Sequence, residues 1–285
     1  MRSKTTEADL LYPYQVVSED QDMRDENRIV FKPNALKRIH TGIVNVWGYV
    51  TRNEHILSSS FRNEKEQEIN LHLKGYPRNH NYLILKKKLI PSFKLYERLR
   101  QVTALYPTSL KSFIDIGCCR GFYALHAANI KTCTVSVGVD VHQPFVHTSN
   151  MVREYLGQQN SSFYMASLDM VSSNPEAYGG PYQTVLLLGL YHYLFWGSNL
   201  CSDAYGSHHK IFQRLSQICT GRLIFSGRLE VDQLPRAEKE KAQSSPKVAE
   251  YNTNCFLKAA EEFFDVHKAG FLGAYPLLVM DRKNV

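Results

Sequence analysis

The sequence lacks any pair of cysteines spaced as CxxC, although it contains six cysteines among its 285 residues. Structural zinc sites and the disulfide frameworks of small domains both use recurrent cysteine spacings. Two of the six, Cys118 and Cys119, are adjacent, and three lie in apolar surroundings. We therefore expect reduced thiols, and neither a disulfide scaffold nor a zinc site.

Long hydrophobic runs are also missing, because no apolar stretch reaches the roughly 20 residues that a membrane-spanning helix needs. The first residues, MRSKTTEADLLY, contain no apolar core of a secretory signal peptide. No internal repeat and no known RNA-binding module can be recognised in the sequence. We therefore expect a cytoplasmic protein that does not bind membranes.

The composition is sufficient for a packed core, since 44% of the residues are hydrophobic and 12% are aromatic. A chain of this length holds one large domain, or one domain with an extension. The formal net charge of +7 would suit a polyanionic partner, but a charge of this size does not identify one.

The first 110 residues are expected to lie outside the main domain, in two parts. Residues 1–28 are polar and carry charges of both signs, which predicts a flexible arm. Residues 29–110 are predicted to form a small α+β accessory or cap region, with a hairpin turn just before His55. Its β-like runs, rich in β-branched and aromatic residues, occupy residues 29–31, 43–50 and 55–57.

Two helices are expected in the second half of this accessory region. Residues 61–74 have a helical composition that ends at Gly75. Residues 82–107 have apolar residues close to helical spacing, interrupted at Pro91, which predicts a helix that caps a ligand cleft. Its other face would carry Lys86, Lys87, Lys88, Lys94, Arg98 and Arg100. Such a face is either solvated or a landing surface for phosphates.

From residue 112 onward, strands alternate with helices, which predicts a parallel sheet in a Rossmann-like α/β fold. Strands are expected at residues 113–116, 135–139, 163–166, 182–188, 222–226 and 274–280. Helices are expected at residues 122–128, 145–156, 208–218 and 256–264. The run YQTVLLL at 182–188 is typical of a central strand buried on both faces. The polar stretch at 233–246 predicts an insertion or a flexible lid.

The most informative stretch is SFIDIGCCRGFYAL, residues 112–125, in which an apolar strand containing Asp115 runs into a glycine turn and a helix. The turn contains Gly117, Cys118 and Gly121. Glycines let backbone N–H groups and a helix N-terminus approach a ligand closely. The spacing differs from the dinucleotide fingerprint Gly-x-Gly-x-x-Gly, which argues against a nicotinamide dehydrogenase.

Acidic residues also stand at the ends of the next two predicted strands. In an open α/β sheet, ligands bind at the carboxyl ends of the strands. Asp140, beside Val141, follows Gly121 by nineteen residues and could accept both hydroxyls of a ribose. Asp169, with Ser167 and Leu168, is placed to accept from an adenine amino group while apolar neighbours sandwich the ring.

Residues 112–285 resemble a class I S-adenosylmethionine (SAM) methyltransferase domain. The first motif of that superfamily, Asp/Glu-x-Gly-x-Gly-x-Gly, is matched by Asp115, Gly117 and Gly121, with Cys119 in place of the middle glycine. Within the superfamily, the sequence is most similar to the group that includes the bacterial tRNA wobble-uridine carboxymethyltransferase. The similar stretches are IDIGCCRGFYAL, VGVDVHQPF, LLLGLYHYL, YNTNCFLKAAEEFFD and GFLGAYPLLVMDRK.

The resemblance implies SAM as the cofactor and an α/β methyltransferase fold for residues 111–285. The Trp-rich acidic segment of the nearest group is not recognisable here, so ordinary SAM is the expected donor and wobble-uridine chemistry is not carried over. A fainter likeness, in residues 193–197, is to enzymes that methylate the terminal phosphate of small RNAs.

The resemblance also places the segment after the fourth strand beside the transferred methyl group. Gly189 and Leu190 would contact the cofactor, and Tyr191 would lie beside its sulfonium substituent. His192 is a candidate base because an imidazole titrates near neutral pH. The alternatives are core packing for Tyr191 and a structural hydrogen bond to the backbone for His192.

The sequence thus predicts a metal-independent methyltransferase that acts by in-line displacement on an O or N atom. The acceptor is an RNA or a small molecule, and the oligomeric state is left open. A metal site at His208 and His209 is not expected, because adjacent helical residues point to different faces. The alternative is a catalytically silent binding protein with the same fold, which Cys119 would support.

Overall fold

The computed structural model describes residues 43–45, 50–51, 54–55, 59–61, 71–73, 80–201 and 204–283. The chain divides into two compact units, Met1–Phe93 and Lys94–Val285. The arm predicted at residues 1–28 and the β-like run at 29–31 lie outside the described residues.

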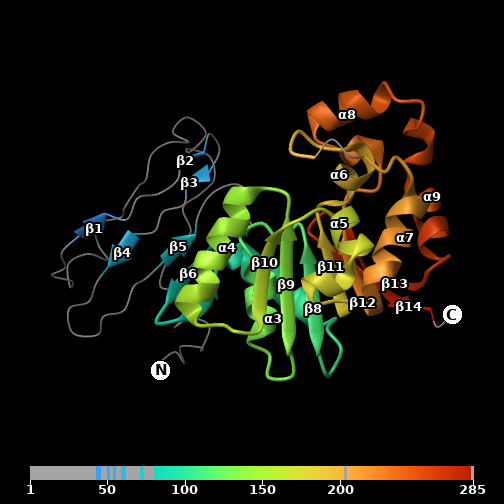
Figure 1. The fold of residues 1–285 in the computed structure, drawn as a ribbon. Coiled ribbons are helices and arrows are strands. Elements are labelled where there is room, and N and C mark those ends of the chain that lie inside the picture. Colours follow the sequence, from blue (N-terminus) through green and yellow to red (C-terminus); the bar gives the residue numbers. More distant parts are fainter. Residues whose placement is uncertain are drawn as a thin grey trace, which may run out of the picture. The chain divides into compact units, whose positions relative to one another are not determined.

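The second unit is built on a seven-stranded mixed sheet with the strand order β10-β9-β8-β11-β12-β14-β13 (Figure 1). The strands are β8 (Ser112–Ile116), β9 (Val135–Asp140), β10 (Ser161–Met165), β11 (Tyr182–Leu188), β12 (Cys219–Ser226), β13 (Phe264–Leu272) and β14 (Tyr275–Arg282). β8 to β12 are parallel, whereas β14 is antiparallel to both of its neighbours. The order reverses between β8 and β11, which is where open α/β sheets bind ligands.

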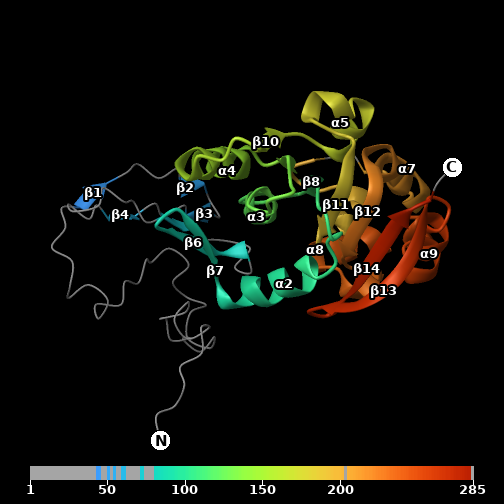
Figure 2. The same ribbon diagram turned by 90° about the horizontal axis from the view of Figure 1, so that it is seen from below.

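Helices cover both faces of this sheet, with α3 and α4 on one face and α5, α7 and α9 on the other (Figure 2). The helices are α2 (Phe93–Thr103), α3 (Phe122–Ala128), α4 (Gln143–Leu156), α5 (Leu168–Ser173), α6 (Tyr191–Trp196), α7 (His208–Ile218), α8 (Arg236–Gln243) and α9 (Thr253–Ala260). Short 3₁₀ turns are η4 (Pro175–Tyr178), η5 (Val231–Gln233) and η6 (Val248–Glu250). The predicted Rossmann-like α/β class is confirmed by this layering.

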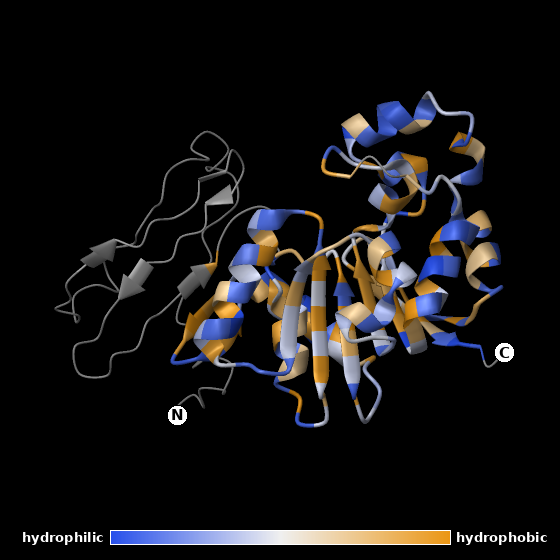
Figure 3. Ribbon diagram, viewed as in Figure 1, coloured by the Kyte–Doolittle hydropathy of each residue, from blue (hydrophilic) through white to orange (hydrophobic). Residues whose placement is uncertain are grey.

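The strand β11 lies in the middle of the core because its sequence is almost continuously apolar. Six of its seven residues are buried, as is typical of a parallel strand covered on both faces. Figure 3 shows hydrophobic residues gathered in the sheet, whereas α8 is largely hydrophilic. The predicted bounds of β11, α3 and α7 are all confirmed.

Predictions for the C-terminal part need correction. Residues 233–246 are more regular than the lid that their polar sequence predicts, since they contain α8. The helix expected at 256–264 begins at Thr253 and ends at Ala260, and Phe264 already belongs to β13. No strand is predicted there, because β13 is an edge strand with mostly exposed side chains and lacks a regular apolar alternation.

The first unit contains short antiparallel pairs. β1 (Ile43–Asn45) pairs with β4 (Ser59–Phe61), and β2 (Val50–Thr51) pairs with β3 (Glu54–His55). The hairpin predicted before His55 is therefore confirmed. The helix predicted at 61–74 is wrong at its C-terminal end, where β5 (Leu71–Leu73) pairs with β6 (Tyr82–Leu85); residues 62–70 lie outside the described residues.

The long helix expected at residues 82–107 is also wrong in its first half. β6 and β7 (Lys88–Pro91) form a hairpin, and only α2 is helical. Lys86 and Lys87 form its two-residue turn with φ of 51° and 57°, the left-handed values that a type I′ turn requires. The predicted basic helix face is wrong for Lys86, Lys87 and Lys88, because they belong to this hairpin and not to a helix.

Candidate active site

The turn between β8 and α3 passes through three left-handed residues at alternate positions. Gly117, Cys119 and Gly121 have φ of 72°, 51° and 73°. Cys119 therefore has the backbone conformation that glycine adopts most easily, at the position where the superfamily motif has its middle glycine. The N–H groups of Gly117 and Cys118 both donate to the Val139 carbonyl, at 2.8 and 2.9 Å. These bonds tie the turn to the end of β9.

The two glycines of the turn are required by close packing as well as by φ. A Cβ atom at Gly121 would lie 2.6 Å from the Phe163 ring and 2.7 Å from Ser149 Oγ. A Cβ atom at Gly117 would lie 2.8 Å from Leu190 Cδ2. Residues more than seventy positions apart in the chain, Gly117 and Leu190, are thus brought together at the carboxyl edge of the sheet.

Asp140 links the end of β9 to the glycine turn through its carboxylate. Oδ2 accepts from the Cys119 N–H and Oδ1 accepts from the His142 N–H, both at 2.9 Å. Burial raises the pKa of Asp140, and these N–H groups act in the opposite direction. Each carboxylate oxygen has a second lone pair, which leaves acceptor capacity toward a ligand hydroxyl.

Asp115 lies inside β8, opposite Gly138 of β9 and Leu186 of β11. Its side chain is 4% exposed. Burial raises the pKa of Asp115 well above its usual value, and the negative charge of Asp140 raises it further. Asp115 thus lies inside the sheet, two residues before the first glycine of the turn.

The third predicted group, around Asp169, lies in the first turn of α5. Ser167 is the N-cap of this helix, with its Oγ accepting from the Met170 N–H, and Leu168 is buried. Asp169 Oδ1 is 2.9 Å from Arg214 Nε of α7. An adenine amino group would therefore share this carboxylate with Arg214.

Tyr191, at the start of α6, is buried in an aromatic cluster with Phe212, Phe225 and Phe256. Its hydroxyl is 2.5 Å from His208 Nδ1. Because His208 Nε2 lies 3.0 Å from a carbonyl oxygen, which can only accept, Nδ1 is the accepting nitrogen and Tyr191 donates. This geometry favours the packing alternative for Tyr191 over a place beside the methyl group.

The buried His208 makes stability depend on pH. Burial lowers the pKa of His208 to about 4, whereas an unfolded histidine titrates near ~6.5. Between these two pKa values the unfolded chain binds the proton and the folded chain does not. The free energy of unfolding is therefore highest above the unfolded pKa, and it falls as the pH is lowered toward the folded pKa. We expect wild type to lose up to about 3 kcal/mol more than His208→Gln between pH 7 and pH 4.

Urea unfolding of both proteins across this pH range measures the difference. Asp115, Asp140 and His192 are present in both, so their contributions to the free energy of unfolding cancel. Parallel pH profiles for the two proteins would contradict this assignment.

His192, the next residue of α6, is 1% exposed, and neither of its ring nitrogens has a hydrogen-bond partner among the described residues. Burial, with a smaller contribution from the charge of Arg228, lowers the pKa of His192 to about 3. The imidazole is therefore neutral at physiological pH, and the expectation that it titrates near neutral pH is wrong for this buried position. The hydrogen bond from His192 to the backbone, which the alternative structural role requires, is not found among the described residues.

Arg228 is a neighbour of His192 that the sequence analysis misses. It follows β12 by two residues, and its guanidinium lies over the Tyr275 ring, 4.9 Å from the centroid. The signal that could have found it is its place just after a parallel strand, at the edge where ligands bind.

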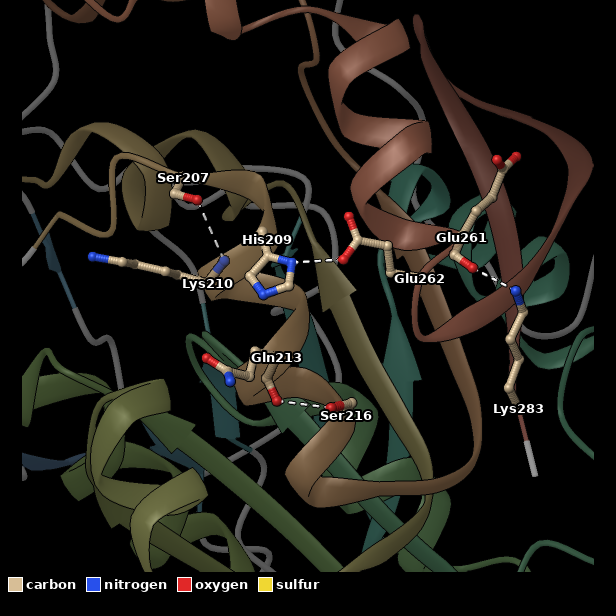
Figure 4. Close-up of polar contacts among 8 residues, drawn as sticks. All are labelled: Ser207, His209, Lys210, Gln213, Ser216, Glu261, Glu262 and Lys283. Atoms are coloured by element: carbon tan, nitrogen blue, oxygen red, sulfur yellow. Dashed lines mark hydrogen bonds and ion pairs between the residues drawn. The ribbon is translucent and has the colours of Figure 1, made fainter. Parts of the chain in front are cut away.

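The histidine beside His208 is used on the surface. Figure 4 shows His209 of α7 directed to Glu262, with Nδ1 2.8 Å from Oε2. Within the described part of the chain, no three His, Cys, Asp or Glu side chains are grouped so that they could hold a metal ion. No helix in the same ranges is long and apolar enough to cross a membrane.

Comparisons with known proteins find similar solved structures at low sequence identity. No protein-family model and no curated protein sequence matches the chain. The chain is similar to the bifunctional kinase-methyltransferase WbdD, with 15% identity and a TM-score of 0.46 over 67% of this chain and 39% of that one. It is also similar to the PH0226 protein of Pyrococcus horikoshii OT3, with 15% identity and a TM-score of 0.47 over 67% and 92% of the two chains.

A third similar structure is the N-methyltransferase NodS of Bradyrhizobium japonicum WM9, with 10% identity and a TM-score of 0.44 over 66% and 94% of the chains. Matches at this level carry no information on activity or substrate. The strand order of the sheet, with its antiparallel β14, is by itself the α/β arrangement typical of class I methyltransferases.

Proposed function

We propose that the chain is a SAM-dependent methyltransferase that acts on an O or N atom. The observation that carries the proposal is the turn between Gly117 and Gly121. This turn follows β8, next to the point where the strand order reverses, and the Cys119 N–H bonds it to Asp140. A Cβ atom at either glycine would lie within 3 Å of a neighbouring side chain, so the turn is packed closely against the rest of the edge. A carboxylate at this edge can accept the ribose hydroxyls of a nucleoside, and open α/β sheets bind ligands there.

The residues that would hold the cofactor are those that the sequence predicts around this turn. Asp140 would accept from the ribose hydroxyls while it keeps the turn in place. Gly189 and Leu190 would line the opposite side, since Leu190 already contacts Gly117. Asp115, in the strand that leads into the turn, would orient the turn. SAM, when bound, supplies an electrophilic methyl group that an aligned nucleophile can attack.

His192 is proposed to accept the proton of the acceptor's hydroxyl or amine group. It is neutral, buried and without a partner among the described residues, so its lone pair is available to a ligand. Tyr191 contributes indirectly, because its place in the aromatic cluster fixes the first turn of α6.

The cofactor is tested by calorimetry with S-adenosylhomocysteine, the demethylated product. We expect one site with micromolar affinity, and no binding of NADH. If S-adenosylhomocysteine fails to bind at 1 mM, the catalytically silent alternative or another ligand replaces this proposal.

The role of His192 is tested with His192→Asn. Transfer of labelled methyl groups from SAM to a metabolite extract or to total RNA should fall about 100-fold, because general base catalysis contributes on this scale. Affinity for S-adenosylhomocysteine should stay within 2-fold of wild type. A variant that transfers methyl groups at the full rate would leave His192 with a structural role.

The pool that accepts the label also decides between an RNA and a small molecule. RNA binding should weaken steeply as salt is raised, because phosphate contacts release counterions. The nearest resemblance, to the tRNA carboxymethyltransferase group, would gain support only if tRNA accepts the label. The silent alternative rests on Cys119, yet its N–H still bonds Asp140 and its φ is that of a glycine.

A further inference from the structure

His192 and Arg228 lie on neighbouring segments at the carboxyl edge of β11 and β12. The last residues of these strands, Leu188 and Ser226, are partners in the sheet, and the Gly189 N–H donates to the Ser226 carbonyl at 2.7 Å. One residue further on, a Cβ atom at Gly227 would lie 3.4 Å from Tyr191 Cβ. The two segments therefore run side by side where His192 and Arg228 follow.

Both side chains hold buried polar atoms that have no hydrogen-bond partner among the described residues. The ring nitrogens of His192 and Nε of Arg228 are buried and have no hydrogen-bond partner among the described residues. A buried polar group without a partner costs free energy, so such groups in native proteins call for a ligand or another explanation.

The acidic residue two positions after Arg228, Glu230, forms hydrogen bonds to another part of the chain. Glu230 Oε1 accepts from the Thr253 N–H at 2.9 Å and from its hydroxyl at 2.5 Å, at the start of α9. The described residues provide no carboxylate within ion-pair distance of Arg228. The positive charge beside His192 is thus not neutralised by the described protein.

The guanidinium of Arg228 is oriented by its surroundings. The guanidinium lies over the Tyr275 ring. The main-chain carbonyl of Arg228 accepts from the Tyr251 hydroxyl at 2.7 Å, which holds the backbone at this residue. A guanidinium presents its N–H groups at the edge of its plane, which matches the two oxygens of a carboxylate or phosphate. Neutral His192 has one N–H donor and one accepting nitrogen, so it can donate to the anion while the other nitrogen remains available as the base.

We propose that Arg228 and His192 form an anion subsite, which binds a carboxylate or phosphate group of a small-molecule methyl acceptor. A group seated beside a side chain that is 1% exposed fits a compact anion better than a polymer backbone. This inference rests on the proposed methyl transfer, since the acceptor must lie beside the cofactor. It restricts the acceptor to acidic small molecules.

The test uses the full chain with inorganic phosphate and with acetate as probes, each in the absence and presence of saturating S-adenosylhomocysteine. Binding is followed by the NMR signals of isotopically labelled histidine side chains, with His192 identified through His192→Asn. We expect both anions, or phosphate alone for a phosphate-bearing acceptor, to shift the His192 signal with a saturable dependence.

Three variants complete the test. Arg228→Gln should raise the dissociation constant of the anion at least 10-fold, and Arg228→Lys should raise it less, because lysine keeps the charge but loses the planar fork. Arg236→Gln removes a charge from an arginine whose side chain is 93% exposed and should change nothing. Affinity for S-adenosylhomocysteine should be unaffected by all three.

Each other outcome overturns the proposal. A His192 signal that neither anion shifts, or equal anion affinity in wild type and both Arg228 variants, would show that no such subsite exists. Weaker S-adenosylhomocysteine binding in both Arg228 variants would show that Arg228 holds the carboxylate of the cofactor instead. If wild type binds the anions but not S-adenosylhomocysteine, the methyltransferase function fails while the anion site stands.

Discussion

Replacing Asp140 with alanine should weaken binding of S-adenosylhomocysteine about 100-fold, which corresponds to ~2.7 kcal/mol. The carboxylate accepts backbone N–H groups of Cys119 and His142 and is proposed to accept the ribose hydroxyls as well. Hydrogen bonds to a charged group contribute about 1.5–3 kcal/mol each, so loss of the ligand bonds and of the ordered turn reaches this value. Calorimetry measures the change.

Two variants control for general effects of the substitution. Asp140→Asn keeps one carbonyl oxygen and the shape of the side chain, so it should lose less affinity than the alanine variant. Asp265→Ala removes a carboxylate from the edge strand β13 that is 62% exposed and 3.9 Å from its nearest cation, and it should bind like wild type. Unchanged affinity in Asp140→Ala would show that the ribose is held elsewhere.

Replacing Gly121 with alanine should lower the free energy of unfolding by about 3 kcal/mol. The left-handed backbone costs a non-glycine residue roughly 1–2 kcal/mol. A Cβ atom would also lie 2.6 Å from the Phe163 ring and 2.7 Å from Ser149 Oγ, and overpacking of this kind costs about 1–3 kcal/mol. Because the turn would move, cofactor affinity should fall with stability.

Gly157 provides a matched control for the backbone contribution. It ends α4 with φ of 71°, almost the same as Gly121, but nothing lies within 4 Å of its Cβ position. Gly157→Ala should therefore lose only about 1 kcal/mol, the cost of the conformation. Urea unfolding of both variants measures the two values. Equal losses of unfolding free energy in the two variants would show that the contact of a Cβ atom with Phe163 adds no cost at position 121.

The site was predictable where its chemistry belongs to one continuous stretch. Asp115 lies near the end of β8, Gly117 and Gly121 follow it at fixed offsets, and Asp140 is the last residue of the next strand. Since a parallel strand brings its carboxyl end to the same edge as its neighbours, these positions follow from strand assignment alone. The buried strand β11 was predictable for the same local reason, an uninterrupted apolar run.

The region before the sheet shows where local pattern is ambiguous. Residues 82–91 contain leucines and isoleucines around three lysines, a pattern that fits a helix face or two short strands. The hairpin has a type I′ turn made by Lys86 and Lys87, without the Asn-Gly signal that usually marks such turns. Pairing of β6 with both β5 and β7 decides between the two, because hydrogen bonding between strands cannot be read from the pattern of either strand alone.

The sequence by itself determined the five parallel strands β8 to β12, the glycine turn and the acid at the end of β9, because each depends on neighbours along the chain. Only the tertiary structure decided which polar groups are used and which are unpartnered. It pairs Tyr191 with His208 and Asp169 with Arg214, and it leaves His192 beside Arg228. Hydrogen bonding and desolvation depend on atoms from distant segments, so no spacing in the sequence could reveal them.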